Sequence, residues 1–178
     1  GLATKWEQID GAWSYFGTYG RMMTGWIQVD GRYYYLNTDG KMVTGWQSDG
    51  TNWYYMDPSS GKMAVGWKQI NGSWYYFNQS GHMITGWLLI DGKYYYLNPA
   101  DGKMVANGSY VINNVNYPFN QDGVCLNESS MIDGGAAGSV YTSPSGTAGT
   151  GNITTGNTAP GTSMTPGNTG MSGNSGYY

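Results

Sequence analysis

A tryptophan recurs every 20 or 21 residues through the first half of the chain, and this repeat limits the fold more than any other feature. An aromatic residue follows each of these tryptophans after seven positions, a tyrosine follows after nine, and a G-x-M triplet comes later in each unit. A unit this short cannot bury a core alone, so its neighbours must supply the packing. The five repeated tryptophans are Trp6, Trp26, Trp46, Trp67 and Trp87.

Each repeat also carries the signal of a tight β-hairpin. Asp-Gly or Asn-Gly dipeptides at 10–11, 30–31, 71–72 and 91–92 suit the central positions of a type I′ turn. In the third repeat, Asp49-Gly50 is followed by two more polar residues, which predicts a longer loop. Because a lone two-stranded hairpin is marginally stable in water, we predict an all-β solenoid of stacked hairpins.

The alternation of side chains gives each hairpin two different faces. A two-residue turn at 30–31 aligns Trp26 with Tyr35 and Gln28 with Tyr33. One face of this hairpin is then aromatic, with Trp26, Tyr33 and Tyr35. The other face is largely aliphatic and carries Ile27, Val29, Tyr34 and Leu36.

The chain divides into two regions of different composition. Residues 1–127 hold five repeats and a degenerate sixth, from about residue 107, which we interpret as a C-terminal cap. In this cap Pro118 stands where the repeated tyrosine would fall. Residues 128–178 are rich in Gly, Thr and Ser, a composition that predicts a flexible tail or linker. The residues before Trp6 resemble those before Trp46, so the chain is expected to begin inside an earlier unit, with more repeats or another domain before it.

The residues offer little catalytic or cofactor chemistry. The aspartates fall at turns, where short carboxylates bond to the backbone, His82 occupies a variable surface position, and Cys125 reads as a small buried hydrophobe. We therefore predict no enzyme within this chain, no cofactor and no metal site, and an enzymatic role would require a catalytic domain outside these residues. The 8 scattered Lys and Arg residues and the net charge of −3 argue against nucleic-acid binding, and no apolar run is long enough to cross a membrane.

The aromatic side chains are therefore the candidates for function. The middle tyrosines of the repeats, Tyr34, Tyr54, Tyr75 and Tyr95, are expected to fill the core. The other face holds up to three large rings in each repeat and few aliphatic side chains, which predicts a ligand-binding surface.

The repeat motifs resemble the choline-binding repeats of Gram-positive bacterial and phage surface proteins. The resemblance rests on T-G-W, the W/Y-Y-Y run and G-x-M, as at residues 44–46, 53–55 and 61–63. It implies a non-catalytic module of a secreted protein, held at the bacterial cell wall by the choline groups of teichoic acid-like polymers. Weak cation–π sites would act together on a polymer that bears many cholines.

The resemblance also implies four cages, each with two walls from one hairpin and a tyrosine from the next. The implied cages are Trp6, Trp13 and Tyr35; Trp26, Tyr33 and Tyr55; Trp46, Trp53 and Tyr76; and Trp67, Trp74 and Tyr96. The methionines implied at the floors are Met42, Met63, Met83 and Met104. A fifth cage, starting at Trp87 and Tyr94, would meet Pro118 as its third wall and is expected to be defective.

Two other functions stay open. Tyr33 and Tyr94 replace tryptophan as second walls, and Gln28, Gln69 and Asn78 offer hydrogen bonds beside the rings, which also suits a sugar. The repeats are similar in rhythm to glucan-binding and clostridial toxin repeats. The second alternative is a structural or adhesive protein whose aromatic faces self-associate.

Overall fold

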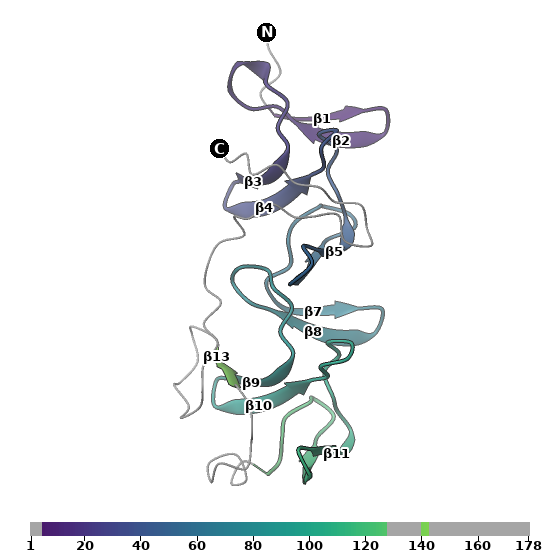
Figure 1. Cartoon of the computed structure of the whole chain (residues 1–178), viewed down its shortest axis with the longest axis vertical. Helices are drawn as coiled ribbons and strands as arrows, with labels where there is room; N and C mark the ends of the chain where they lie inside the picture. The colour runs from purple at the N-terminus through teal and green to yellow at the C-terminus, as the bar shows by residue number, and fades with distance from the viewer. Residues whose placement is uncertain (1–4, 128–139, 143–178) are drawn as a thin grey trace. The chain divides into compact units, whose positions relative to one another are not determined.

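The computed structural model describes residues 5–127 and 140–142, and over these ranges the chain is built from paired β-strands (Figure 1). One 3-10 turn, η1 (Thr18–Gly20), interrupts the strands. No helix in the described ranges is long and apolar enough to cross a membrane. The described residues form two compact units, 5–65 with 79–82, and 66–78 with 83–127 and 140–142.

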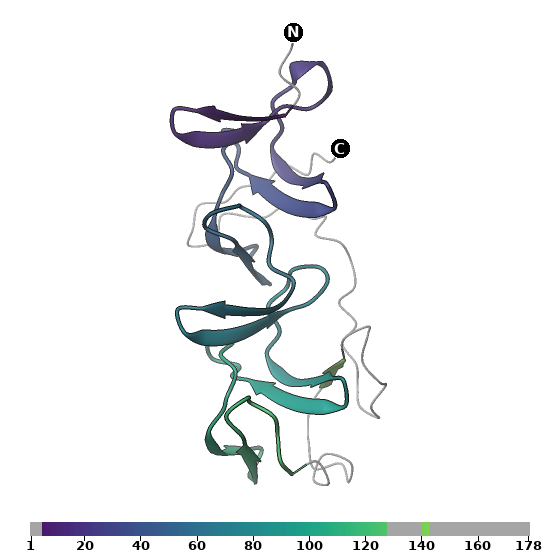
Figure 2. The same cartoon turned by 180° about the vertical axis from the view of Figure 1, so that it is seen from behind.

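The strands of residues 5–127 pair as antiparallel hairpins in sequence order (Figure 2). The hairpins are β1 (Trp6–Ile9) with β2 (Ala12–Tyr15), β3 (Gly25–Val29) with β4 (Arg32–Leu36), β5 (Gly45–Ser48) with β6 (Trp53–Met56), β7 (Gly66–Ile70) with β8 (Ser73–Phe77), β9 (Gly86–Ile90) with β10 (Lys93–Leu97), and β11 (Gly108–Ile112) with β12 (Val115–Phe119). This confirms the all-β class and the repeated hairpins.

The turns have the predicted geometry. Asp30 and Gly31 both have positive φ, 49° and 73°, as a type I′ turn requires. The third hairpin has a four-residue loop, 49–52, in which the Asp49 carboxylate accepts hydrogen bonds from the N–H groups of Thr51 and Asn52 at 2.8 and 2.7 Å. The longer loop predicted there is confirmed.

The register of β3 and β4 is also the predicted one, with Trp26 opposite Tyr35 and Gln28 opposite Tyr33. Each Trp and the tyrosine nine residues later are cross-strand partners, and their rings lie against each other on one face of the hairpin. In the second hairpin the ring centroids of Trp26 and Tyr35 are 5.2 Å apart. The same contact recurs in the other four repeats.

Backbone hydrogen bonds from the G-x-M triplets join hairpins within a unit. The Met42 N–H donates to the Trp13 carbonyl at 2.7 Å, and Met104 donates to Trp74 at 2.8 Å. In the sixth unit Cys125 takes the methionine position and donates to Tyr94 at 2.8 Å. Cys125 is buried, as predicted. The triplet therefore places each methionine, or its replacement, beside the second aromatic wall of the preceding hairpin.

The glycine of one triplet packs on the methionine of the triplet before it. Gly123 has φ +78°, and a Cβ added there would lie 2.5 Å from Sδ of Met104. Gly102 meets Met83 in the same way at 2.5 Å. These glycines are required both by the left-handed backbone and by the space that the methionine occupies.

A short strand from the C-terminal region pairs with the fifth hairpin. β13 (Val140–Thr142) runs parallel to β9, with Val140 opposite Trp87. Tyr141 is 4% exposed and packs with Leu88 and Leu97. The predicted flexible tail therefore contains an ordered strand, and the rest of that prediction lies outside the described residues.

Candidate functional site

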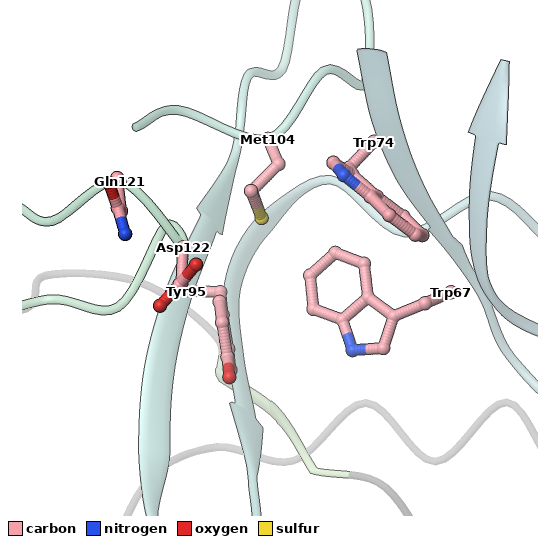
Figure 3. A pocket seen from close by; sticks show the side chains of 6 residues that line it. All are labelled: Trp67, Trp74, Tyr95, Met104, Gln121 and Asp122. Atoms are coloured by element: carbon pink, nitrogen blue, oxygen red, sulfur yellow. The ribbon is translucent and has the colours of Figure 1, made fainter. Parts of the chain in front are cut away.

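The second unit contains an aromatic pocket between its consecutive hairpins β7–β8 and β9–β10 (Figure 3). Its volume is about 320 Å³, large enough for a small organic cation. The residues that line it are Trp67, Trp74, Tyr95, Met104, Gln121 and Asp122. We call this the open site.

The ring walls of the open site are steeply inclined to one another. The ring centroids of Trp67 and Trp74 are 6.4 Å apart with an interplanar angle of 87°, and Trp67 lies 5.0 Å from Tyr95 at 67°. Trp74 is 41% exposed, so an indole face is free to meet a ligand. Met104 is held beside Trp74 by its backbone hydrogen bond, and its thioether points toward the ring walls (Figure 3).

The third wall is Tyr95, where Tyr96 had been expected. Tyr96 lies opposite Trp87 in its own hairpin, and the two rings are 5.0 Å apart on the face that continues toward the next hairpin. Tyr95 points to the opposite face, so it meets Trp67 of the hairpin before. Tyr95, which was expected to fill the core, therefore takes the place beside Trp67 that was expected for Tyr96, and the choice of ligand-contacting residues stays a prediction.

Polar groups lie on one side of the open site. Gln121 and Asp122, in the loop after β12, are both exposed and line the pocket. Burial raises the pKa of the Tyr95 hydroxyl, and the negative charges of Asp91 and Asp122 raise it further. The phenol therefore stays neutral at physiological pH, while the carboxylate contributes negative potential.

A related cluster is present at the first hairpin. The Trp6 ring lies 4.9 Å from Tyr34 at an angle of 64°, and Met42 packs into the same cluster. Trp13 is 44% exposed. Tyr35, the expected third wall, packs on Trp26 instead, because the two are cross-strand partners in the same hairpin.

The cluster at the second hairpin is closed. We use this name for Trp26, Tyr33, Tyr54 and Met63, of which Trp26 and Tyr54 are each 1% exposed. The two rings are 5.2 Å apart. The Trp26 indole N–H is buried and has no hydrogen-bond partner among the described residues. The expected third wall, Tyr55, packs on Trp46 in its own hairpin at 5.1 Å.

Two polar residues hold Tyr54 within the closed cluster. Its hydroxyl donates to Asp49 Oδ2 at 3.0 Å, and the His82 ring meets the Tyr54 ring edge-on at 5.2 Å. Burial lowers the pKa of His82, although the charge of Asp49 opposes this. His82 is therefore a partly buried aromatic contact, whereas the sequence had suggested a variable surface position.

The third predicted cage draws on both units, so it remains a prediction. In the first unit, Trp46 and Trp53 lie 6.3 Å apart at 83°, which closely matches the Trp67–Trp74 pair. In the second unit, Tyr76 packs on Trp67 at 5.2 Å, and Met83 packs beneath Gly102.

The fifth hairpin has a complete set of rings, but they pack tightly together. Trp87 lies 4.8 Å from Tyr117 and 5.9 Å from Phe119, and only 3% of it is exposed. Pro118, expected as the third wall, is opposite Ser109 in the β11–β12 pair, and the neighbouring Tyr117 faces Trp87. That no ligand binds at this hairpin stays a prediction. Its reason changes from a missing third ring to the dense packing of the rings around Trp87.

Comparison with known proteins decides the family. Residues 23–66 and 64–109 match the family model described as a choline-binding repeat, and residues 4–22 match a model described as a cell wall binding repeat. The chain belongs to the choline-binding repeat family. Proteins of this family are associated with the cell wall of Gram-positive bacteria. Comparison with curated proteins gives no match.

Solved structures of such proteins share the fold. CbpJ from Streptococcus pneumoniae is 38% identical with a TM-score of 0.66, and 69% of this chain aligns with 42% of that one. Choline-binding protein F from Streptococcus pneumoniae with a peptidoglycan analogue is 36% identical with a TM-score of 0.67, over 70% and 41% of the two chains. Its complex with ipratropium aligns at 42% identity and a TM-score of 0.62, over 69% and 38%. The chain spans about two fifths of the length of these structures.

Of the residues that line the open site, Trp67, Trp74 and Met104 are among those expected from the sequence, whereas Tyr95, Gln121 and Asp122 are not. Side-chain alternation already separated Tyr34 from the Trp26 face, so it contained the signal for the tyrosines. Gln121 and Asp122 reach the pocket from the loop after β12, which belongs to the next hairpin along the chain. No local sequence pattern indicates that this loop lies at the pocket.

Proposed function

We propose that this chain is a non-catalytic attachment module that binds the choline groups of a teichoic acid-like polymer at a Gram-positive cell surface. The observation that carries the proposal is the open site, in which Trp67, Trp74 and Tyr95 face a common space above Met104. A trimethylammonium group has no hydrogen-bond donor, so ring faces are well suited to hold it.

The walls are sufficient for a weak site. Each cation–π contact is worth about 0.5 to 2 kcal/mol, and tryptophan is the best partner. After ordering costs, a net binding free energy of about 4 kcal/mol corresponds to a dissociation constant near 1 mM. Retention on a polymer would then come from several sites acting together.

Exposure separates the repeats that we propose as binding sites from those that we do not. The repeats with two tryptophan walls keep a half-exposed indole at Trp13, Trp53 and Trp74, with exposures of 44%, 39% and 41%. The repeats with a tyrosine as second wall bury their first tryptophan, Trp26 or Trp87. We therefore propose ligand binding at the first, third and fourth repeats.

A choline titration of Trp74→Ala tests the proposal. Free choline from about 1 to 100 mM should raise the melting temperature of the unsubstituted protein, since it binds the folded state. Trp74→Ala should bind one choline fewer by calorimetry. Tyr94→Ala is the matched control, because Tyr94 holds the same repeat position beside the packed Trp87 cluster, and it should leave the stoichiometry unchanged. A melting temperature that does not respond to choline would reject the proposal.

Glucan binding is the second candidate, favoured by the Gln121 amide beside the aromatic walls. Sugars need both ring faces and hydrogen-bonding groups. A neutral glucan oligosaccharide titrated in parallel should leave the melting temperature unchanged if choline is the ligand. Sedimentation of the same samples tests the adhesive alternative, which requires assembly that increases with protein concentration and does not respond to choline.

A further inference from the structure

The open site has a carboxylate among its lining residues. Asp122 comes from the loop after β12, one hairpin beyond the strands that carry Trp67, Trp74 and Tyr95. In Figure 3 its oxygens lie near Tyr95, on the opposite side of the pocket from the tryptophans. A negative charge here adds to the attraction of the ring faces for a cation and adds nothing for a neutral ligand.

The loop that carries Asp122 is held in place at several points. Asn120 Oδ1 accepts hydrogen bonds from the N–H groups of Asp122 and Val124 at 3.0 and 2.9 Å. The next residue, Gly123, packs against Met104 of the pocket, and the Cys125 N–H donates to the Tyr94 carbonyl at 2.8 Å. The backbone of Asp122 is therefore fixed relative to the aromatic walls, and its charge stays beside the pocket.

The equivalent loops of the other repeats differ in charge. The residue before the triplet glycine is Tyr19, Asp39, Ser60, Ser80, Asp101 or Asp122, and the residue after that glycine is Arg21, Lys41, Lys62, His82, Lys103 or Val124. Asp122 is thus the one aspartate of this series that no lysine follows.

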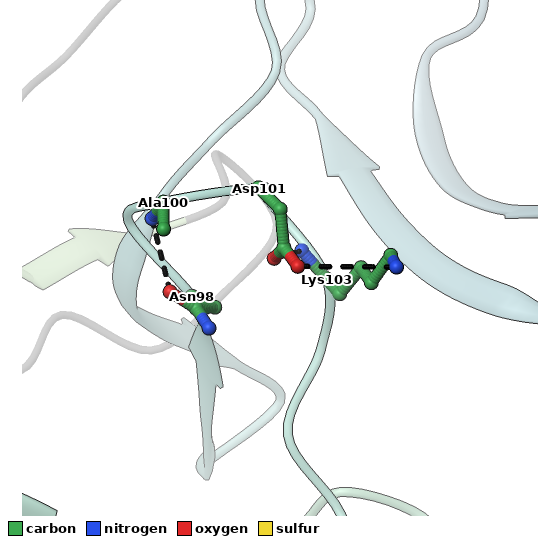
Figure 4. A network of polar contacts seen from close by, with 4 residues as sticks. All are labelled: Asn98, Ala100, Asp101 and Lys103. Carbon is green, nitrogen blue, oxygen red and sulfur yellow. Dashed lines mark hydrogen bonds and ion pairs between the residues drawn. The ribbon is translucent and has the colours of Figure 1, made fainter.

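The loop of Asp101 demonstrates the effect of that lysine (Figure 4). Lys103 Nζ lies 3.9 Å from Asp101 Oδ2, so a positive charge offsets much of the local negative potential. Both side chains are about half exposed, so the pair contributes little to stability. Val124 occupies the equivalent position beside Asp122 and leaves its charge without that partner.

We propose that Asp122 makes the open site selective for cations over neutral ligands of the same shape. This inference rests on the proposed function and names the residue that sets its charge preference. Because Asp122 is exposed, water and salt screen its field, and the expected contribution is about threefold in affinity at low ionic strength.

Choline and 3,3-dimethylbutanol, its uncharged isostere, test the proposal on the full chain labelled with fluorotryptophan. The fluorine resonance of Trp74 reports binding at this site alone. Asp122→Asn should weaken choline binding about threefold and leave binding of the isostere unchanged. Val124→Lys, which gives Asp122 a lysine partner like that of Asp101, should weaken choline binding in the same way. Raising the salt concentration from about 20 to about 500 mM should remove the difference in choline affinity between the unsubstituted protein and Asp122→Asn.

Asp39→Asn is the matched control, because it removes the same charge from a loop with the same asparagine cap, and Asp39 does not line this pocket. It should leave both affinities at Trp74 unchanged. Equal choline affinity in the protein and in Asp122→Asn would overturn the role of Asp122 while leaving choline binding intact. A Trp74 resonance that does not respond to choline in any variant would overturn the proposed function itself.

Discussion

The closed cluster at Trp26 and the open site at Trp67 are built from the same repeat motif, but their exposure differs greatly. Trp26 and Tyr54 are each 1% exposed, whereas Trp67 is partly exposed and Trp74 is 41% exposed. In the closed cluster, Asp49 and His82 contact Tyr54. In the open site, the loop after β12, which corresponds to the loop of His82, presents Asp122 at the pocket. The motif therefore determines which rings are present, and the contacts around them determine whether a ligand can enter.

The largest expected effect is on stability at the closed cluster. Trp26→Ala removes a fully buried indole and should lower the free energy of unfolding by about 3 to 5 kcal/mol, without loss of a bound choline. Urea unfolding and calorimetric stoichiometry check the two parts. One choline fewer in Trp26→Ala would remove the distinction between the two clusters.

Glycine substitution in the open site should have the next largest effect. Gly123→Ala combines a left-handed backbone with a collision against Met104, so it should cost about 2 to 3 kcal/mol and shift that methionine in the pocket. Gly31→Ala is the control, because it has φ +73° with no atom within 4 Å of the added Cβ, and about 1 kcal/mol is expected there. Equal losses measured by urea unfolding would mean that the methionine contact contributes nothing.

Removing the hydroxyl of Tyr54 or of Tyr95 should have smaller effects on stability, which differ between the closed cluster and the open site. Tyr54→Phe removes the donor that meets Asp49 and should cost about 1 to 2 kcal/mol. Tyr95→Phe should change the free energy of unfolding by less than about 0.5 kcal/mol, since no described residue hydrogen-bonds to its hydroxyl. A larger loss in Tyr95→Phe than in Tyr54→Phe would contradict the comparison.

The pH dependence of the closed cluster should be the smallest effect. Burial lowers the pKa of His82 in the folded protein below the value of 6.5 that the unfolded chain has. Protons therefore bind the unfolded state preferentially, and stability should fall as pH decreases below about 6.5 until His82 is protonated in both states. Urea midpoints of the protein and of His82→Gln, compared from pH 7.5 to pH 5, measure this, and His82→Gln should lose less stability over that range.

The difference between local and long-range interactions explains how far the sequence could predict the fold. The Asp-Gly and Asn-Gly turns and the alternation of side chains are local, so the hairpins, their register and the longer loop at 49–52 were all predicted correctly. The strand Val140–Thr142 was missed, because a Gly-rich and Ser-rich context hides three residues whose partner, β9, lies some fifty positions earlier.

By itself, the sequence determined the repeat, the two faces of each hairpin and the rings available for a ligand, since turn geometry and side-chain period depend on neighbouring residues. The tertiary structure alone decided that Tyr95 faces Trp67, that Asp122 lies at the same pocket, and that the rings around Trp26 and Trp87 are closed. Those outcomes depend on how successive hairpins and their returning loops pack, and packing joins residues that no short-range pattern relates.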